Sequence, residues 1–277
     1  GTLLINALQE HTGPWRLHVT CVDYPGGPVG MVRCQLVEQA IITFLKDKRR
    51  RLLKARVVDP ATAWQPDEVL VQLALEAGDR GWLSSCPPEL RHRLRRQLSR
   101  FPGGLVVVPE DDAPPSMAFR KLVEAELHLG RPIAAGEQVV DLGGSPGGWS
   151  HVALERGARV TTVDRSPLRE DLMRHPRLTF ISGDAFRYEP PVPVDWLLCD
   201  VIAFPQRTLE LLERWLSAGL CRRFCVTIKF RGQEDDAKLE AFKAMLERVN
   251  AVFLIRRLHA NRNEATALGE VGEATIT

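Results

Sequence analysis

The stretch VVDLGGSPGGWS, residues 139–150, constrains the fold more than any other part of the chain. Its apolar start predicts a buried strand with Asp141 at the carboxyl end, and Trp149 opens an amphipathic segment that runs to Glu155. The turn between them contains four glycines, which have no side chains: Gly143, Gly144, Gly147 and Gly148. A strand, a glycine turn and a helix start let a ligand approach the backbone closely in α/β folds. The sequence therefore predicts an α/β domain with a ligand site after this strand.

Strands and helices alternate around this stretch. Hydrophobic patterning predicts strands over residues 159–163, 178–182, 195–199, 224–228, 252–258 and 265–268. Helices are predicted over residues 117–129, 204–218 and 234–249. Such alternation predicts a parallel, doubly wound sheet, which binds its ligands at the carboxyl ends of the strands.

The first 110 residues follow a different pattern. We expect a strand over 15–21, a helix over 32–48, a hairpin over 68–85 with its turn at 78–81, and a helix over 87–101. The polar, proline-containing connection VPEDDAPPS, residues 108–116, then separates this compact α+β module from the rest. A chain of 277 residues is long enough for two domains, and we expect them at 1–110 and 111–277.

Charge is distributed unevenly between the two parts. Residues 1–110 carry 15 Lys and Arg against 11 Asp and Glu, and the remaining residues carry 22 against 24. The basic excess is clustered in two runs, Lys46–Arg56 and Arg91–Arg100. One basic run is often only a solvated helix face, but two in one small domain favour a phosphate backbone as partner.

Cysteine spacing and hydropathy exclude several other classes of protein. The six cysteines form no C-x-x-C pair, so we expect reduced thiols, no metal site and a cytoplasmic location. Cys221 and Cys225 are expected to pack around a strand. No apolar stretch approaches the roughly 20 residues of a membrane span, and no signal peptide is recognisable, so no membrane partner is expected.

The ligand of the glycine turn can be narrowed further. A dinucleotide fingerprint that starts at Gly143 needs glycine at position 145, which is Ser145, and no G-K-[ST] motif is present. Asp164 closes the second strand and could accept both ribose hydroxyls of a nucleoside, and Asp184 follows the third strand, where it could meet an adenine amino group. A sulfonium cation with an adenosine tail suits a glycine loop ringed by carboxylates, so the predicted cofactor is S-adenosyl-L-methionine. Taken singly, each acid could instead be a helix cap or turn former.

DLGGSPGGWS resembles the loop of the FtsJ/RrmJ-type RNA 2′-O-ribose methyltransferases. This resemblance implies a Rossmann-like class I S-adenosylmethionine-dependent domain and a Lys-Asp-Lys-Glu tetrad, which falls on Lys121, Asp200, Lys229 and Glu264. The cofactor-binding residues that the loop and the strand ends imply are Asp141, Gly143, Ser145, Pro146, Gly147, Gly148, Trp149, Asp164, Asp184 and Asp200.

Within that family the chain is most similar to the RlmM group, through KLVEAE, W-x-x-CD and WLSAGLCR. The group implies a cytidine of 23S rRNA as substrate, no DNA, a monomer, and a THUMP-like RNA-binding domain over residues 1–110. The group also has a ferredoxin-like domain at its N-terminus, and this chain is expected to begin inside or after it. Ala118 stands where a cofactor-contacting serine is expected, and the tail after Gly269 has no counterpart.

The tetrad suits the chemistry of a ribose hydroxyl, which is a very weak acid. Lys229 could act as base if burial and the Lys121 cation lower its pKa, whereas Asp200 and Glu264 oppose that shift, and the sequence leaves the net direction open. The fourth strand lacks the Pro-Cys and [DN]-P-P-[FY] motifs of base methyltransferases. A methyltransferase for another RNA site or a small molecule, and a catalytically silent RNA-binding homologue, remain as alternatives.

Overall fold

The computed structural model describes residues 2–9, 11–21, 28–76, 80–230 and 236–272. The chain divides into two compact units, residues 1–105 and 106–277. The expected domain boundary was residue 110, inside the polar connection. We describe the first as unit 1 and the second as unit 2.

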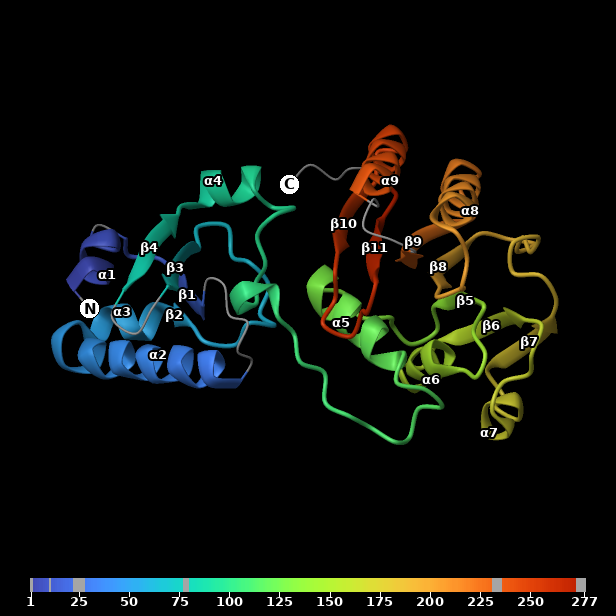
Figure 1. Ribbon diagram of the computed structural model, residues 1–277, viewed down its shortest axis with the longest axis horizontal. Helices are drawn as coiled ribbons and strands as arrows, with labels where there is room; N and C mark the ends of the chain where they lie inside the picture. The colour runs from blue at the N-terminus through green and yellow to red at the C-terminus, as the bar shows by residue number, and fades with distance from the viewer. Residues whose placement is uncertain (1, 10, 22–27, 77–79, 231–235, 273–277) are drawn as a thin grey trace. The chain divides into compact units, whose positions relative to one another are not determined.

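Unit 1 is a four-stranded sheet with helices. The strand order is β2 (Arg56–Val57), β1 (Trp15–Cys21), β3 (Val69–Leu75), β4 (Gly81–Cys86). β1 runs parallel to β2 and β3, while β3 and β4 form the antiparallel hairpin that the sequence predicts. The helical segments are α1 (Thr2–Ala7), α2 (Pro28–Lys48), α3 (Arg50–Ala55), α4 (Pro88–Arg93) and the 3₁₀ turn η1 (Pro102–Gly104) (Figure 1). Trp15, Leu45 and Val71 are fully buried in its core.

The helix predicted over residues 87–101 is much shorter than expected. α4 ends at Arg93, because the chain then turns to bury Arg100, whose guanidinium donates to the Ala61 carbonyl at 3.0 Å. Arg91 is also used inside the unit, since it donates to the backbone carbonyls of Gln65, Pro66 and Glu68. The interpretation of the whole second basic run as a phosphate-binding surface was therefore wrong for these two arginines.

Unit 2 is built on a seven-stranded sheet of order β10-β11-β9-β8-β5-β6-β7. The strands are β5 (Gln138–Leu142), β6 (Arg159–Asp164), β7 (Leu178–Ser182), β8 (Val194–Cys199), β9 (Cys221–Lys229), β10 (Val252–Arg256) and β11 (Glu264–Glu270). β5 to β9 are parallel, as predicted. β11, however, is antiparallel to both β9 and β10, so the prediction of an all-parallel sheet was wrong. Residues 257–263 are too short a link for the crossover that parallel neighbours need.

Helices cover both faces of this sheet (Figure 1). α8 (Pro205–Ser217) and α9 (Asp236–Arg248) lie on one face, and α5 (Phe119–Leu129) and α6 (Gly148–Glu155) on the other, while α7 (Glu170–Met173) follows β6. Trp215 of α8 and Phe242 of α9 are buried against Phe224 of β9. Because β5 to β9 run in the same direction, their carboxyl ends all lie along one edge of the sheet.

Across the part of the chain that the structure describes, no helix combines the length and the apolar character needed to cross a membrane.

Candidate functional site

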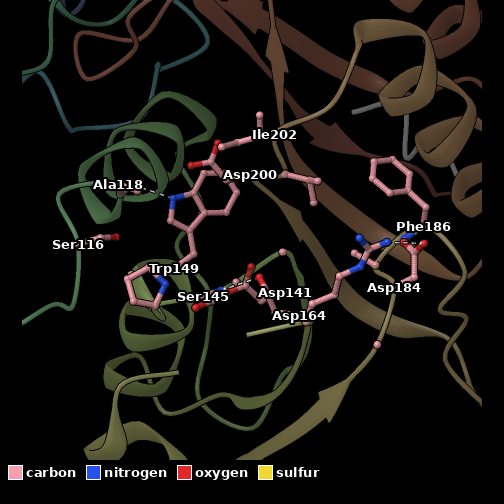
Figure 2. A pocket seen from close by; sticks show the side chains of 18 of the residues that line it. Ser116, Ala118, Asp141, Ser145, Trp149, Asp164, Asp184, Phe186, Asp200 and Ile202 are labelled. Carbon is pink, nitrogen blue, oxygen red and sulfur yellow. Dashed lines mark hydrogen bonds and ion pairs between the residues drawn. The ribbon is translucent and has the colours of Figure 1, made fainter. Parts of the chain in front are cut away.

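A cavity of about 570 Å³ lies at the carboxyl edge of the sheet in unit 2 (Figure 2). The turn after β5, the residues that follow β6, β7 and β8, and the end of β9 all contribute to its wall. Most of the predicted cofactor-binding residues line it, namely Asp141, Gly143, Ser145, Pro146, Gly148, Trp149, Asp164, Asp184 and Asp200. Gly147 lies behind the wall, next to Leu172.

The glycine turn has room for glycine only. Gly147, the residue just before α6, has a φ of 116°, and a Cβ on it would lie 2.4 Å from Leu172 Cδ1. A Cβ on Gly144 would lie 2.6 Å from Asp141 Oδ2. The turn is therefore packed so closely at Gly144 and Gly147 that neither position has space for a side chain.

Asp141 is a buried acid held by hydroxyl groups. The Ser150 hydroxyl donates to Asp141 Oδ2 at 2.6 Å, and the hydroxyl of Thr162 lies 2.6 Å from that of Ser150. Burial, against the hydrogen bond from Ser150 and together with the nearby Asp200 charge, raises the pKa of Asp141 to about 7. This acid therefore shapes the inner wall, and near neutral pH it can be present with or without its proton.

Asp164 and Asp184 are placed by backbone N–H groups. Asp164 accepts from Ser145 N at 3.0 Å and from Ser166 N at 2.9 Å, which ties the end of β6 to the glycine turn. Asp184 accepts from Phe186 N at 2.9 Å and pairs with Arg165 at 3.1 Å. The Phe186 N–H, and after it Arg165, lower the pKa of Asp184. The contacts of Asp164 with a cofactor ribose and of Asp184 with a cofactor adenine remain predictions.

The residues before α5 form another part of the wall. Ser116 and Ala118 line the cavity, and the Trp149 indole N–H donates to the Ala118 carbonyl at 2.7 Å. Figure 2 shows Ser116, Ala118 and Trp149 together on one side of the cavity. Position 118 thus keeps its backbone carbonyl in use although the serine hydroxyl expected there is missing.

The four residues of the predicted tetrad are in contact. Asp200 lies between the two lysines, with its carboxylate 3.0 Å from Lys121 Nζ and 3.1 Å from Lys229 Nζ. Lys121 also pairs with Glu264 at 2.6 Å, and Lys229 Nζ donates to the Asp200 backbone carbonyl at 3.0 Å. Asp200 and Lys229 line the cavity, whereas Lys121 and Glu264 support them from behind.

Secondary structure explains how residues so distant in sequence meet. Lys229 is the last residue of β9, and the register of the antiparallel β11 places Glu264 directly opposite it. Asp200 follows β8, the parallel neighbour of β9, and Lys121 lies in the first turn of α5. The reversed direction of β11, which the sequence did not predict, is thus what brings Glu264 to the carboxyl edge.

The two lysines have different surroundings. Burial alone would lower the pKa of Lys121, but the carboxylates of Asp200 and Glu264 outweigh it and raise that pKa above its usual value. Lys121 is therefore a fixed cation, which orients Asp200. Lys229 pairs with Asp200, its one carboxylate partner among the described residues, and its side chain lines the cavity.

Several wall residues were missed by the sequence analysis. Arg165, Phe186, Ile202 and Arg207 all line the cavity. The first three follow the ends of β6, β7 and β8 by a few residues, and this position at a strand end was the available signal. Arg207 comes from the first turn of α8, and its guanidinium lies 4.1 Å from the ring centre of Phe186.

A known protein family matches the part of the chain that carries this site. The model of the FtsJ-like methyltransferase family matches residues 115–253, which span the glycine turn, Asp200 and Lys229. The chain belongs to the FtsJ-like methyltransferase family. Its fold is accordingly the Rossmann-like fold of S-adenosylmethionine-dependent methyltransferases, and a separate unit of mixed sheet precedes it in the sequence.

Curated relatives carry the name ribosomal RNA large subunit methyltransferase M. The chain is 40% identical over 119 residues to the protein from Pseudomonas putida W619, covering 43% of this chain and 33% of that one. It is 33% identical over 180 residues to the protein from Marinomonas sp. MWYL1, covering 61% and 51%. The match to the protein from Thauera aminoaromatica is 29% over 235 residues, covering 81% and 62%. The chain thus spans about one third to three fifths of the length of these relatives.

The cavity suits the cofactor of the family, S-adenosyl-L-methionine. Its volume is within the roughly 300–1,000 Å³ of small-molecule sites. Its wall offers a bare backbone turn and the carboxylates of Asp164 and Asp184, which fit a cationic ligand that carries ribose hydroxyls. Among the described residues no group of three or more His, Cys, Asp or Glu side chains is arranged to hold a metal ion.

Proposed function

We propose that this chain transfers a methyl group from S-adenosyl-L-methionine to the 2′-hydroxyl of an RNA ribose, most specifically a cytidine of 23S rRNA. The observation that carries the proposal is the contact of Lys229, Asp200, Lys121 and Glu264 at one corner of the cofactor-sized cavity. Family membership and the printed name of the curated relatives support the substrate class.

The cofactor-binding residues have separate roles in this proposal. Asp164 would accept hydrogen bonds from the two ribose hydroxyls of the cofactor, and Asp184 would accept one from its adenine amino group. The glycines of the turn at residues 143–148 would let the sulfonium end approach the backbone. When bound, the cofactor supplies an electrophilic methyl group.

Lys229 is the proposed base. Its Nζ would receive the proton of the ribose hydroxyl, provided that it is neutral at that moment, while the oxygen forms its bond to the methyl carbon. Asp200 holds Lys229 through both its carboxylate and its backbone carbonyl. Lys121, fixed as a cation by Asp200 and Glu264, keeps Asp200 in place. No covalent protein intermediate is needed, and alignment of the reacting atoms supplies much of the rate.

Unit 1 is proposed to be a THUMP-like RNA-binding unit. Its exposed basic residues around Arg49–Arg51 support this role, as does the presence of a sheet with helices ahead of the catalytic unit. RNA would then be bound by one unit and modified by the other.

The test of the proposed function is methylation of an unmodified 23S rRNA transcript by the chain and its Lys229→Ala variant, with ribose methylation mapped along the RNA. Cofactor affinity, measured by calorimetry, should survive in the variant, since Lys229 belongs neither to the glycine turn nor to the acids Asp164 and Asp184 that are proposed to bind the cofactor. Methyl transfer should fall by about 10²–10⁴-fold, the usual size of a general-base contribution.

Lys229→Arg is the matched variant, because it keeps the positive charge but cannot accept a proton. Near-normal turnover of this variant would show that Lys229 acts only as a cation. A chain that binds both RNA and cofactor but methylates no ribose would instead be a catalytically silent homologue.

A further inference from the structure

The link between β10 and β11, residues 257–263, is a basic loop at the edge of the sheet that carries Lys229. β10 ends there, and the antiparallel β11 starts there with Glu264 opposite Lys229. Phe230, which follows Lys229, donates its N–H to the Asn263 carbonyl at 3.0 Å, and Asn263 Nδ2 donates back to the Phe230 carbonyl at 3.1 Å. The loop is therefore fastened to the end of the strand that presents the proposed base.

A buried carboxylate fixes the middle of this loop. Glu124, only 1% exposed, accepts the backbone N–H of His259 at 2.8 Å and of Ala260 at 3.2 Å. Glu124 lies on α5, the helix that also carries Lys121. Because the buried Glu124 carboxylate accepts two backbone N–H groups of the loop, it holds the loop in a defined conformation.

Two arginines of the loop are exposed and lack a carboxylate partner among the described residues. Arg257 lies with its guanidinium 5.5 Å from the ring centre of Phe230, and Arg262 is exposed two residues before Glu264. Arg165, an exposed arginine that lines the cavity, is by contrast paired with Asp184 at 3.1 Å. Two guanidinium groups without a carboxylate partner among the described residues, on a loop that is hydrogen-bonded to the residue after Lys229, are suited to an anionic partner.

We propose that Arg257 and Arg262 bind the phosphates of the RNA strand that delivers the target nucleotide to Lys229. The inference rests on the proposed function, and it adds a binding surface outside the cofactor cavity. A target ribose next to Lys229 carries its own phosphates only a few bonds from the reacting hydroxyl. A rigid loop fastened to Phe230 and Asn263 is therefore placed to hold the strand in register with the base. Sequence readout is not expected from such contacts.

The experiment compares the unsubstituted chain with the double variant Arg257→Gln/Arg262→Gln. Fluorescence anisotropy with a labelled single-stranded RNA 20-mer would give RNA affinity at several salt concentrations. We expect a loss of about 10-fold or more in RNA affinity. The slope of log affinity against log salt should become shallower by about two, one for each lost phosphate contact. Cofactor affinity by calorimetry should stay unchanged, and in methylation rates measured over a range of 23S rRNA transcript concentrations the KM should rise far more than kcat falls.

The matched control is Arg159→Gln/Arg222→Gln. Both arginines are exposed, and they lie at the opposite, amino edge of the sheet, Arg159 as the first residue of β6 and Arg222 as the second residue of β9. Equal RNA affinity and equal salt slope in the two double variants would overturn the proposal. So would a loss of cofactor affinity confined to Arg257→Gln/Arg262→Gln, since the loop would then belong to the cofactor site.

Failure of the proposed function gives a different result. In that case the unsubstituted chain methylates no ribose, while the anisotropy comparison still decides whether the loop binds RNA. If Arg257→Gln/Arg262→Gln weakens binding of the RNA 20-mer more than the control double variant does, while the unsubstituted chain methylates no ribose, the RNA-binding surface is supported and the proposed reaction is rejected.

Discussion

At the scale of single residues, the cavity places one acid in an environment that changes its protonation near neutral pH. Asp141 is buried, and burial moves its pKa from 3.8 to about 7. Between these two values the folded chain holds a proton that the unfolded chain has released. The stability that this proton contributes is complete below about pH 4 and is lost as the pH rises to about 7.

Asp141→Asn should remove this dependence, because an amide has no proton to lose in this range and still accepts from Ser150. The free energy of unfolding of the unsubstituted chain, relative to the variant, should fall by up to about 1.4 kcal/mol per pH unit between pH 4 and 7. Urea titrations at several pH values measure it. The control Asp112→Asn changes an exposed carboxylate. Parallel curves for the chain and Asp141→Asn would contradict the buried-acid interpretation.

The resemblance to a family predicted the residues of the site better than their contacts. It selected Lys121, Asp200, Lys229 and Glu264, and the structure brings them together. The hydroxyl chain from Ser150 to Asp141 was not predicted, because a serine early in a helix has many ordinary roles. Nor was the buried Glu124, whose charge is satisfied by backbone groups 135 residues away in sequence.

At the scale of elements, hydrophobic patterning located the strands but not the direction of the last two. A run of apolar residues predicts burial and says nothing of polarity along the sheet, so β11 was expected to be parallel. The decisive signal was the short link at 257–263, which permits only an antiparallel return. Similarly, the helical pattern of residues 87–101 could not show that Arg100 would be drawn inside.

The turn between β5 and α6 allows a test at this scale. Gly147→Ala forces a side chain onto a φ of 116° and pushes a Cβ to 2.4 Å from Leu172 Cδ1. Strain of this kind costs about 1–3 kcal/mol, and displacement of the turn should also weaken cofactor binding. Gly136→Ala is the control, since it has a φ of 83° with nothing within 4 Å of the added Cβ. Urea titration and calorimetry give both quantities.

The expected ordering of the two glycine variants is definite. Gly136→Ala should lose some stability and keep its cofactor affinity, whereas Gly147→Ala should lose more stability and also affinity. Equal losses in both would mean that backbone conformation alone, without packing against Leu172, sets the cost.

At the scale of the whole molecule, the net charge of +2 conceals how the cations are used. In unit 1, Arg16 forms a buried ion pair with Glu68 at 2.7 Å, and Arg91 and Arg100 bind backbone carbonyls. These cations hold the unit together. Exposed arginines such as Arg49–Arg51 are available to a polyanionic partner, and sequence counting could not separate the two groups.

Neutralising Arg49–Arg51 together, as Arg49→Gln/Arg50→Gln/Arg51→Gln, is therefore expected to weaken RNA binding without touching the catalytic unit. These arginines are exposed, and Arg49 and Arg51 line a cavity of about 360 Å³ in unit 1. Each lost phosphate contact lowers the slope of log affinity against log salt by about one. Anisotropy with the RNA 20-mer should show both the weaker affinity and the shallower slope, while calorimetry should show the same cofactor affinity. The control removes three exposed arginines of unit 2, Arg159, Arg174 and Arg222. If the two triple variants bind RNA alike, the run in unit 1 is only a solvated helix face.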